Sequence, residues 1–402
     1  MQSAILAALH ENLDAAQIVS DGADIAPYGT DWTGEFKIRP LAVLRPSSTK
    51  DVARAVSLCA EHGVAVVPQG GRTGLCGGGV PIDGQPCVIL SLERMNTIRR
   101  IDTGARTMTA EAGVILENAQ ARALELDMIF PLTFGAQGSA MLGGALSTNA
   151  GGSNVVRYGT TRELCVGIEA VMPDGSIVNA LSGLRKDNTG YDLRDLLIGA
   201  EGTLGIITAA VFKLSPKPRV RIAAFLSLAN LADAPEVLNR LQDQTGGGVV
   251  AFEYMPRPAV DVICREFPDI RPPLDEPAEH GVFAEVASTR SDDAQLEDDG
   301  TSRLGNQVLE IFADLLEQRI IADAMIAQSD AQRDQLWHMR ESLLEAITAN
   351  GPALHTDISL PLAEIASFVK DMDLAVEQLG FQPLTVGHLG DGNLHYTLAD
   401  RK

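Results

Sequence analysis

The chain has 402 residues, and its 32 Lys and Arg against 53 Asp and Glu give a formal net charge of −21. A hydrophobic content of 45% excludes a disordered chain, and the length predicts two or three domains of roughly 150 residues each. The negative charge would repel phosphate groups, so we expect no nucleic acid and no anionic lipid surface as a general partner.

Cysteine usage and the N-terminus indicate the compartment. The 5 cysteines are scattered and form no C-x-x-C pair, which is typical of a reducing environment. No run approaches the roughly 18 consecutive apolar residues of a transmembrane segment. The first residues, MQSAILAALHENLDAAQIVSDG, lack the basic start of a signal peptide and the arginines of a mitochondrial presequence. We therefore expect a cytoplasmic protein, and a peripheral position at the inner membrane is compatible with these features.

The first half alternates short apolar runs with amphipathic stretches. Residues 41–44 predict a strand, and Ser48-Thr49 predicts the cap of a helix whose apolar positions Val52, Val56 and Cys59 share one face. Strands are also expected at 64–67, 88–92 and 107–110, with a helix at 114–127. Two further strands, 168–172 and 177–180, flank a Pro-Asp-Gly turn and predict a hairpin. The pattern indicates an α+β fold.

A change in composition at Leu214-Ser215-Pro216-Lys217-Pro218 predicts a domain boundary. Beyond it we expect strands at 222–228, 249–254 and 282–286, a helix at 232–244, a polar loop at 291–302 and a long helix at 329–349. A last helix opens at Pro361 and closes at Gly380. The predicted organisation is an N-terminal helical segment (1–37), a first domain (38–217) and a second domain (218–402).

Three glycine-rich segments lie in the first domain, at 68–79, 131–152 and 199–207. Glycines let backbone N–H groups approach a pyrophosphate closely, so three such segments together predict a site for a large phosphate-bearing cofactor. No G-x-G-x-x-G opens a helix after a strand, and no G-K-[ST] is present. The sequence therefore favours neither a Rossmann NAD site nor a P-loop.

The segments PQGGRTG (68–74), PLTFGAQGSAMLGGALSTNAGG (131–152), RKDNTGYDL (185–193) and GAEGTLGIIT (199–208) carry a family resemblance. The chain resembles the flavoproteins related to vanillyl-alcohol oxidase and p-cresol methylhydroxylase. Among these it is most similar to the D-2-hydroxyglutarate/D-lactate dehydrogenase and glycolate oxidase D-subunit group. The resemblance implies a two-subdomain FAD-binding domain followed by an α+β substrate, or cap, domain. It also implies the cofactor-binding residues Pro68, Gln69, Gly70, Gly71, Arg72, Thr73, Gly74, Leu75, Pro131, Gly135, Ser139, Gly143, Gly144, Thr148, Asn149, Gly151, Glu201, Gly202, Gly205, Ile206 and Ile207. Some relatives attach flavin through a histidine in the first loop, and residues 68–79 contain none, so non-covalent FAD is expected.

A second motif near the end reads His388-Leu389-Gly390-Asp391-Gly392-Asn393-Leu394-His395. With Asp391-Gly392 as a two-residue turn, the two histidines become a direct cross-strand pair with Cβ atoms about 5 Å apart. Such a pair suits two ligands of one metal ion, and a plain pair of half-buried strand histidines is the alternative.

The resemblance assigns further roles. H-x-G-D-G-N-x-H matches the group's divalent-metal motif, with zinc the expected ion on His388 and His395. In relatives a glutamate from a later segment completes the ligand set, and this chain stops at Lys402, so we expect an incomplete end of the second domain. The W-x-x-R-E pattern at 337–341 implies that Arg340 holds a substrate carboxylate. His355 stands where hydroxyglutarate-specific members carry a lysine, and Thr397 where they carry an asparagine, which favours a smaller hydroxy acid.

These features predict an FAD-dependent dehydrogenase that oxidises a D-2-hydroxy acid to the 2-oxo acid, with the hydride passing to flavin N5. Its partners would be the small 2-hydroxy acid and an electron acceptor, namely an electron-transfer flavoprotein, a quinone or a c-type cytochrome. A homodimer is compatible with the sequence. Two alternatives stay open: a non-catalytic or truncated flavin-binding subunit of a glycolate oxidase-type complex, and a cell-wall precursor reductase with the same FAD fold.

Overall fold

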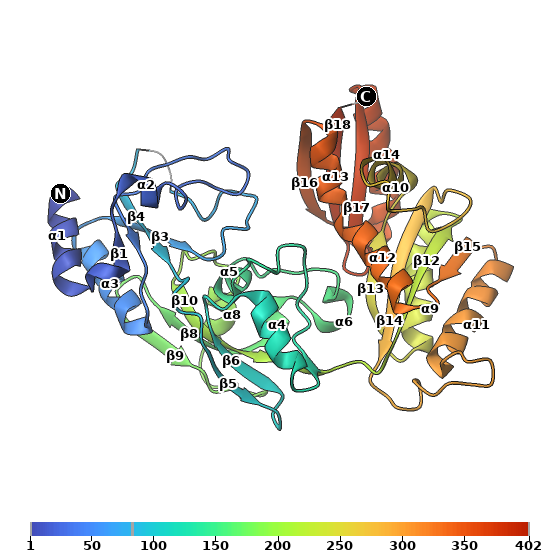
Figure 1. Ribbon diagram of the computed structural model, residues 1–402, viewed down its shortest axis with the longest axis horizontal. Coiled ribbons are helices and arrows are strands. Elements are labelled where there is room, and N and C mark those ends of the chain that lie inside the picture. The colour runs from blue at the N-terminus through green and yellow to red at the C-terminus, as the bar shows by residue number, and fades with distance from the viewer. Residues whose placement is uncertain (1, 82–83, 401–402) are drawn as a thin grey trace. The chain divides into compact units, whose positions relative to one another are not determined.

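The computed structural model describes residues 2–81 and 84–400, and the chain divides into two compact units (Figure 1). The first unit runs to Gly151 and resumes at Gly159–Lys217. The second consists of Gly152–Tyr158 and the residues from Pro218 onward. The chain therefore passes between the units on either side of Gly152–Tyr158 and again at the two prolines that flank Lys217, where helical backbone is disfavoured.

The first unit contains a four-stranded sheet of order β1-β2-β4-β3, in which β4 pairs in parallel with both β2 and β3. Its elements are β1 (Ile18–Val19), β2 (Val43–Leu44), β3 (Ala65–Gln69), β4 (Cys87–Ser91), α1 (Gln2–Asn12), η1 (Ala15–Gln17), α2 (Gly22–Ile25) and α3 (Thr49–Glu61). Ser48 caps α3 as expected, because its side chain accepts a hydrogen bond from the Asp51 backbone N–H. Ile5 and Leu9 of α1 share one apolar core with Val52 of α3, so residues 1–37 help to build this unit.

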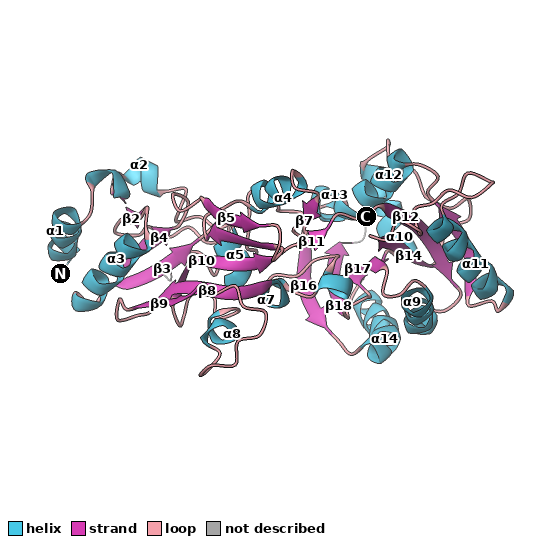
Figure 2. Ribbon diagram, turned by 90° about the horizontal axis from the view of Figure 1, so that it is seen from below, coloured by secondary structure: helices cyan, strands magenta, loops and turns pink. Residues whose placement is uncertain are grey.

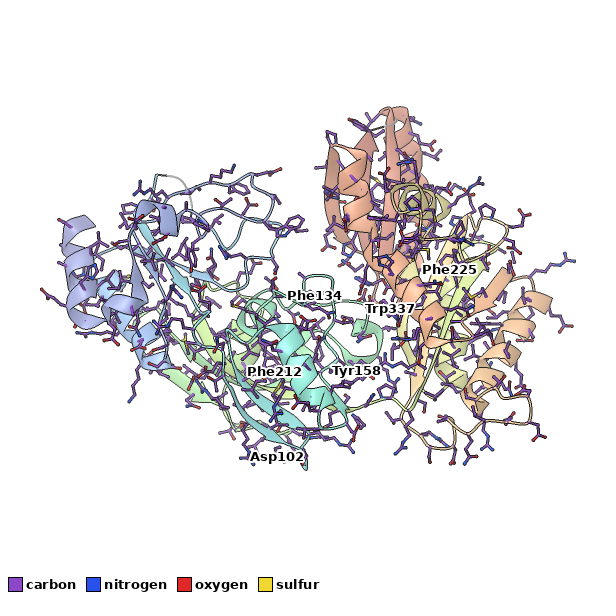
Figure 3. All side chains as sticks on the ribbon, viewed as in Figure 1. Asp102, Phe134, Tyr158, Phe212, Phe225 and Trp337 are labelled. Atoms are coloured by element: carbon purple, nitrogen blue, oxygen red, sulfur yellow. The ribbon has the colours of Figure 1, made fainter. Side chains whose placement is uncertain are left out.

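A five-stranded antiparallel sheet of order β5-β6-β10-β8-β9 forms the rest of the first unit. Its elements are β5 (Ile98–Asp102), β6 (Thr107–Glu111), β8 (Cys165–Val171), β9 (Ile177–Ala180), β10 (Ile206–Lys213), α4 (Leu116–Leu124), α5 (Leu142–Ser147), α7 (Thr161–Leu164) and α8 (Leu193–Leu197), beside the small pair β7 (Met128–Ile129) and β11 (Ser215–Pro216). The predicted hairpin is confirmed, since β8 pairs with β9 from Ile168↔Ala180 to Val171↔Ile177. Phe212 of β10 is fully buried and its ring centroid lies 5.1 Å from that of Phe130 (Figure 3).

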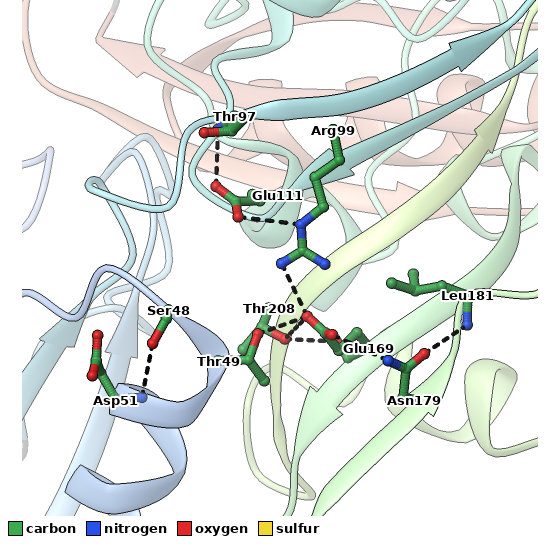
Figure 4. A network of polar contacts seen from close by, with 10 residues as sticks. All are labelled: Ser48, Thr49, Asp51, Thr97, Arg99, Glu111, Glu169, Asn179, Leu181 and Thr208. Atoms are coloured by element: carbon green, nitrogen blue, oxygen red, sulfur yellow. Dashed lines mark hydrogen bonds and ion pairs between the residues drawn. The ribbon is translucent and has the colours of Figure 1, made fainter.

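Glu169 of β8 links helix α3 to the five-stranded sheet of the first unit through a polar network (Figure 4). Its carboxylate accepts hydrogen bonds from Thr49 Oγ1 of α3 at 2.6 Å and from Thr208 Oγ1 of β10 at 3.0 Å. Arg99 Nη2 of β5 lies 3.2 Å from the same carboxylate. These attractions outweigh desolvation and hold the pKa of Glu169 below its usual value, so the buried group is ionised and paired.

The second unit is built on a seven-stranded antiparallel sheet of order β15-β12-β14-β13-β17-β18-β16. The strands are β12 (Val220–Leu228), β13 (Val249–Tyr254), β14 (His280–Ser288), β15 (Ile321–Ile326), β16 (Ala353–Ser359), β17 (Phe381–His388) and β18 (Asn393–Asp400). Strands β13 and β14 are buried except at His280, the first residue of β14, which explains their largely apolar sequences.

Helices cover both faces of this sheet (Figure 2). One face carries α10 (Arg257–Glu266), α12 (Asp330–Glu341) and α13 (Leu343–Asn350); the other carries α6 (Val155–Tyr158), η2 (Leu231–Asp233), α9 (Ala234–Gln244), α11 (Arg303–Glu317), η3 (Leu362–Glu364) and α14 (Ile365–Gln378). The single helix expected at 329–349 is wrong, because the chain breaks at Ser342 between α12 and α13. The Ser342 hydroxyl donates to the His338 carbonyl at 2.7 Å, a bond that bends helices. Leu344, at the start of α13, is 40% exposed.

Candidate active site

The three glycine-rich segments of the first unit meet at their backbones. A Cβ on Gly71 would lie 2.1 Å from the Ser139 carbonyl oxygen, and one on Gly202 would lie 2.7 Å from Pro68 Cγ. The Glu201 N–H donates to the Ser147 carbonyl at 2.9 Å. Side chains at Gly71 and Gly202 would force these segments apart, so glycine is required there for the loops to converge.

Each of the three segments also contains one non-glycine residue in the left-handed region. Arg72 has φ 57°, Asn149 has φ 49° and Glu201 has φ 51°. Asparagine tolerates this conformation, whereas Arg and Glu are strained there by about 1–3 kcal/mol. Among the described residues, Arg106, Asp127 and Arg319 have the same conformation elsewhere, so the strain accompanies the tight course of these segments without by itself assigning a function.

An open cavity of about 640 Å³ lies within the first unit and falls in the size range of small-molecule sites. Its lining includes four of the expected cofactor residues, Gly71, Arg72, Thr73 and Ser139. The lining also includes Ala26, Pro27, Thr30, Asp31 and Trp32, which the sequence did not indicate. Trp32 is 57% exposed, and the only sequence signal for it is a large aromatic residue in a polar stretch.

Gln69 supplies the chemical evidence that these residues fit a hydrogen-bonding cofactor. Its amide Nε2 donates to the Tyr28 carbonyl at 2.8 Å and to the Gly79 carbonyl at 2.7 Å, which fixes the amide orientation. Its buried Oε1 has no partner among the described residues. Gly74, Gly135 and Gly144 would each point a Cβ into open space. An unused acceptor and open glycines suit a bound molecule rich in hydroxyl groups, as the ribityl and ribose parts of FAD are.

Other expected cofactor residues have structural surroundings of their own. Ile206 and Ile207 are 6% and 3% exposed, with their side chains in the protein core, so only their backbone could reach a ligand. Leu75 is 49% exposed. The remaining members of the expected set, Gly70, Pro131, Gly143, Thr148, Gly151 and Gly205, lie in or beside the converging segments. In the segment RKDNTGYDL, Tyr191 is 95% exposed, and Asp192 caps α8 by accepting a hydrogen bond from the Asp195 backbone N–H.

In the second unit, the histidine hairpin has a different register from the one predicted. His388 pairs with Asn393, and His395 pairs with Val386, so the direct histidine pair is wrong. The connection has four residues instead of two because Leu389 is buried in the core and Gly390 N–H donates to the Phe252 carbonyl at 3.3 Å. The shift is by two residues and therefore preserves the face. The rings remain diagonal neighbours with centroids 5.3 Å apart.

A fully buried carboxylate, Glu253 of β13, connects His388 to Arg340. Glu253 Oε1 lies 2.9 Å from His388 Nδ1, and Glu253 Oε2 accepts from Arg340 Nε at 2.6 Å. Burial would raise the pKa of Glu253, but the attraction of His388 and Arg340 and their hydrogen bonds prevail and lower it to about 2. Glu253 is therefore ionised. Sequence reasoning missed it, although a lone acidic residue inside the run Val-Val-Ala-Phe-Glu-Tyr is itself a signal.

Helix α12 is held over this face by a second buried carboxylate, Glu285 of β14. Arg333 Nε lies 2.8 Å and Trp337 Nε1 lies 2.6 Å from Glu285 Oε2. Trp337 also packs edge-on against Phe283 with ring centroids 4.8 Å apart (Figure 3). Arg333, Trp337 and Arg340 are spaced i, i+4 and i+7, so one stripe of α12 faces the sheet.

The remaining predicted residues lie on the same face of the sheet. His395 Nδ1 is 3.7 Å from Asp357 Oδ1, and His355 Nδ1 lies 3.1 Å from Thr397 Oγ1. Burial, reinforced by His388 and Arg340, lowers the pKa of His395 to about 4, so this imidazole is uncharged at neutral pH. The structure thus brings Arg340, His388 and His395 together, whereas His355 lies on edge strand β16 and contacts Thr397.

These residues fit a metal ion only in part. His388 and His395 supply two nitrogen donors at a suitable separation, whereas catalytic zinc takes three protein ligands. Within residues 2–81 and 84–400 there is no group of three or more His, Cys, Asp or Glu side chains that could hold a metal. Glu253 is engaged by Arg340 and by His388 Nδ1, so it is an outer partner of the histidine and not a third ligand.

Comparisons with known proteins cover nearly the whole chain. Residues 40–181 match the FAD binding domain family, and residues 217–401 match the C-terminal domain of FAD linked oxidases. The mitochondrial D-2-hydroxyglutarate dehydrogenase of Arabidopsis thaliana is 34% identical, covering 97% of this chain and 67% of the relative. That of Bos taurus is 33% identical over 97% of this chain and 69% of its own length.

This chain belongs to the D-2-hydroxyglutarate and D-lactate dehydrogenase family. A mitochondrial Schizosaccharomyces pombe protein, provisionally named a D-lactate dehydrogenase, is 33% identical over 97% of this chain and 74% of its own length. The FAD-binding domain and the FAD-linked oxidase domain make it an FAD-dependent oxidoreductase with mixed helices and sheets. This confirms the family and the fold class expected from the glycine-rich segments.

Solved structures show the same fold. p-Cresol methylhydroxylase with substrate bound aligns with a TM-score of 0.74 at 16% identity, over 99% of this chain and 82% of that one. Alkyldihydroxyacetonephosphate synthase aligns with a TM-score of 0.73 at 18% identity, over 99% of this chain and 81% of that one. Among the helices that the structure describes, none is both long and apolar enough to span a bilayer.

Proposed function

We propose that this protein oxidises a small D-2-hydroxy acid, of the D-lactate or D-2-hydroxyglutarate type, to the 2-oxo acid. The observation that carries the proposal is the cluster on one face of the seven-stranded sheet, where Arg340 and His388 share the buried carboxylate of Glu253. An anionic chain needs such a local cation to gather an anionic substrate. The names of the relatives support the same substrate class.

The cofactor part of the proposal is non-covalent FAD held by the converging segments of the first unit. Gly71, Thr73 and Ser139 line the cavity, and Gln69 Oε1 offers an acceptor to a cofactor hydroxyl. Bound FAD supplies the hydride acceptor at N5. The chain's own part is to hold the cofactor and the hydroxy acid in place and to take one proton from the substrate hydroxyl.

Arg340 is proposed to hold the substrate carboxylate. Glu253 occupies Nε, and neither Nη1 nor Nη2 has a partner in the part of the chain that the structure describes. The end of the guanidinium therefore presents two parallel N–H donors, the geometry that matches a carboxylate. His355, exposed at the edge of the cluster and bonded to Thr397, would contact a substituent at the far end of the substrate. A titratable histidine there favours a shorter hydroxy acid over a dicarboxylate.

His388 and His395 are proposed to act at the hydroxyl. Nδ1 of His388 faces Glu253, so Nε2 on the opposite side of the ring offers its lone pair to the site. That lone pair either accepts the hydroxyl proton directly or ligates a divalent metal, with zinc the expected ion. A metal on these two nitrogens would act as a Lewis acid on the hydroxyl. Because the described ligands number two, the proton transfer proposed here relies on the imidazole.

The electron acceptor, compartment and assembly remain predictions from the sequence. An electron-transfer flavoprotein, a quinone or a c-type cytochrome would reoxidise FAD. A cytoplasmic location is still proposed for this chain, although the relatives carry mitochondrial names. Subcellular fractionation tests the location, and sedimentation tests the homodimer.

The experiment that tests the function is anaerobic reduction of the FAD-loaded chain by the D and L forms of lactate and 2-hydroxyglutarate, and by glycolate. We expect the visible flavin absorbance to bleach with at least one D-2-hydroxy acid, and an Arg340→Lys variant to need a higher concentration of the same acid. Absence of bleaching with every acid would contradict the proposal and favour the alternative, a non-catalytic flavin-binding subunit. Bleaching by NADPH instead would favour the reductase. Bleaching that persists in the presence of a chelator would contradict the proposed role of a metal ion.

A further inference from the structure

Glu253 has an arrangement that the proposed chemistry does not explain by itself. It is the one carboxylate of β13, it is completely buried, and each of its oxygens contacts a different predicted functional residue. Arg340 comes from α12 and His388 from the end of β17, so these groups are distant in sequence. A buried charge costs much free energy unless it is fully paired, and this one is paired only with the site.

We propose that Glu253 is the positioning residue of this site: it holds His388 with the proton on Nδ1, so that Nε2 is the lone-pair nitrogen, and it fixes Arg340 through Nε. The contacts of Glu253 do not depend on the proposed function; the consequence of those contacts for catalysis rests on it. No resemblance to known proteins assigned a role to Glu253, which lies outside the motifs that indicated the family.

The chemical argument begins with the tautomer of His388. A carboxylate that pairs with an arginine only accepts hydrogen bonds, so the nitrogen at 2.9 Å from Glu253 Oε1 carries the proton. In the neutral imidazole the other nitrogen is then the acceptor. Binding a metal ion and accepting a hydroxyl proton both require that acceptor, and the carboxylate behind the ring fixes the orientation of the imidazole.

The second half of the argument concerns Arg340. Rotation of the guanidinium about its Cδ–Nε bond would turn the Nε–H away from Glu253 Oε2 and break the hydrogen bond. Its Nη1 and Nη2 therefore keep a fixed direction relative to His388, because both groups are attached to the same carboxylate. One residue thus sets the spacing between the group that holds the substrate carboxylate and the group that meets its hydroxyl.

The site also provides a matched control in Glu285. This second buried carboxylate lies on the same face of the sheet and also binds α12, through Arg333 and Trp337. It has no contact with His388 or Arg340 among the described residues. Glu285→Gln should weaken the attachment of α12 as Glu253→Gln does, while leaving the tautomer of His388 unchanged.

The decisive measurement is the ¹⁵N spectrum of the histidine rings in the FAD-loaded, chelator-treated full chain at pH 8. The chain has 7 histidines, and the loss of one signal in His388→Gln assigns His388. We expect Nδ1–H in the wild type and in Glu253→Asp where the contact is kept. In Glu253→Gln the amide has one acceptor for two donors, so we expect the proton on Nε2. Observation of Nε2–H or of a doubly protonated ring in the wild type overturns the inference without any variant.

Kinetics give a second readout that separates this inference from the function itself. We expect Glu253→Gln to lower kcat/KM by about 10- to 100-fold, with both a lower kcat and a higher KM. Glu285→Gln should raise KM and leave kcat within about twofold. If the wild type oxidises hydroxy acids and Glu253→Gln matches Glu285→Gln in both parameters, Glu253 is merely structural. If no hydroxy acid is oxidised, the function fails and the ¹⁵N spectrum still decides the role of Glu253.

Discussion

Replacing Gly71 with alanine tests how the glycine-rich segments build the FAD site. Gly71 does not have a positive φ, so alanine meets no backbone penalty there, and the whole effect comes from one methyl group. That methyl would lie 2.1 Å from the Ser139 oxygen and 2.9 Å from its carbon, and real Cβ contacts are almost never below 3.0 Å. The two backbones must therefore separate by at least 3.0 − 2.1, or 0.9 Å.

Backbone presses on backbone at this contact, so no side chain can rotate away. Overpacking of this kind costs about 1–3 kcal/mol, and we expect the upper part of that range. For a unit of this size the loss corresponds to a fall of roughly 4–12 °C in melting temperature. Because the segment between Pro68 and Gly79 moves with Gly71, we also expect the purified variant to contain little FAD.

The matched control is Gly74→Ala, in the same segment. Its Cβ would have nothing within 4 Å, and its φ is also not positive. The FAD-free variant should therefore have the same melting temperature as the FAD-free wild type. If the open space at Gly74 belongs to the cofactor, FAD binding should weaken all the same. Differential scanning calorimetry of the FAD-free proteins and the ratio of flavin to protein after gel filtration measure both quantities. An unchanged melting temperature and full FAD content in Gly71→Ala would refute the packing argument.

Three further predictions concern stability and the hairpin. Glu169→Gln should lose about 1–3 kcal/mol of unfolding free energy at pH 7, measured by urea denaturation. Because the pKa of Glu169 is lower in the folded state than in the unfolded state, this loss of stability should persist at every pH above the unfolded pKa of about 4.3. It should vanish as the pH falls through the folded pKa. Burial raises the pKa of Asp373, so its contribution to the unfolding free energy is present at low pH and is lost as the pH rises through the folded pKa. Asp373→Asn keeps the acceptor for the Tyr396 hydroxyl. This variant should therefore raise the melting temperature more at pH 8 than at pH 4. Gly392→Ala, at φ 82° and 2.2 Å from the Leu360 oxygen, should reduce hydroxy-acid turnover with unchanged FAD content, and equal turnover would show that the hairpin tolerates a shift.

The glycine-rich segments show how far the sequence could lead. Their composition predicted a backbone-lined cofactor site, because glycine is needed wherever two backbones approach within a side chain's width. It could not show that residues 26–32 of the N-terminal segment line the same cavity, since nothing in that stretch has a motif. Contacts between segments distant in the chain depend on how the sheets pack.

The histidine hairpin shows the opposite balance. The Asp-Gly pair correctly predicted a reversal between two strands, but the turn has four residues because Leu389 packs into the core. The two histidines still share a face, since strand side chains alternate with a period of two and the register moved by two. The two-residue alternation of strand side chains thus placed both histidines on the same face, although the predicted turn length was wrong.

Short motifs were enough to predict the family, the cofactor class and the candidate residues Arg340, His388 and His395, because the chemistry of each motif is local. Only the tertiary structure showed that Glu253 connects two of them, that Glu285 anchors α12 above the sheet, and that the single long helix breaks at Ser342. The net charge of −21 is likewise a property of the sequence, whereas the local balance of charge around Glu253 arises from three elements of the fold. Burial decides that balance, since a carboxylate removed from water must find its partners wherever the fold brings them.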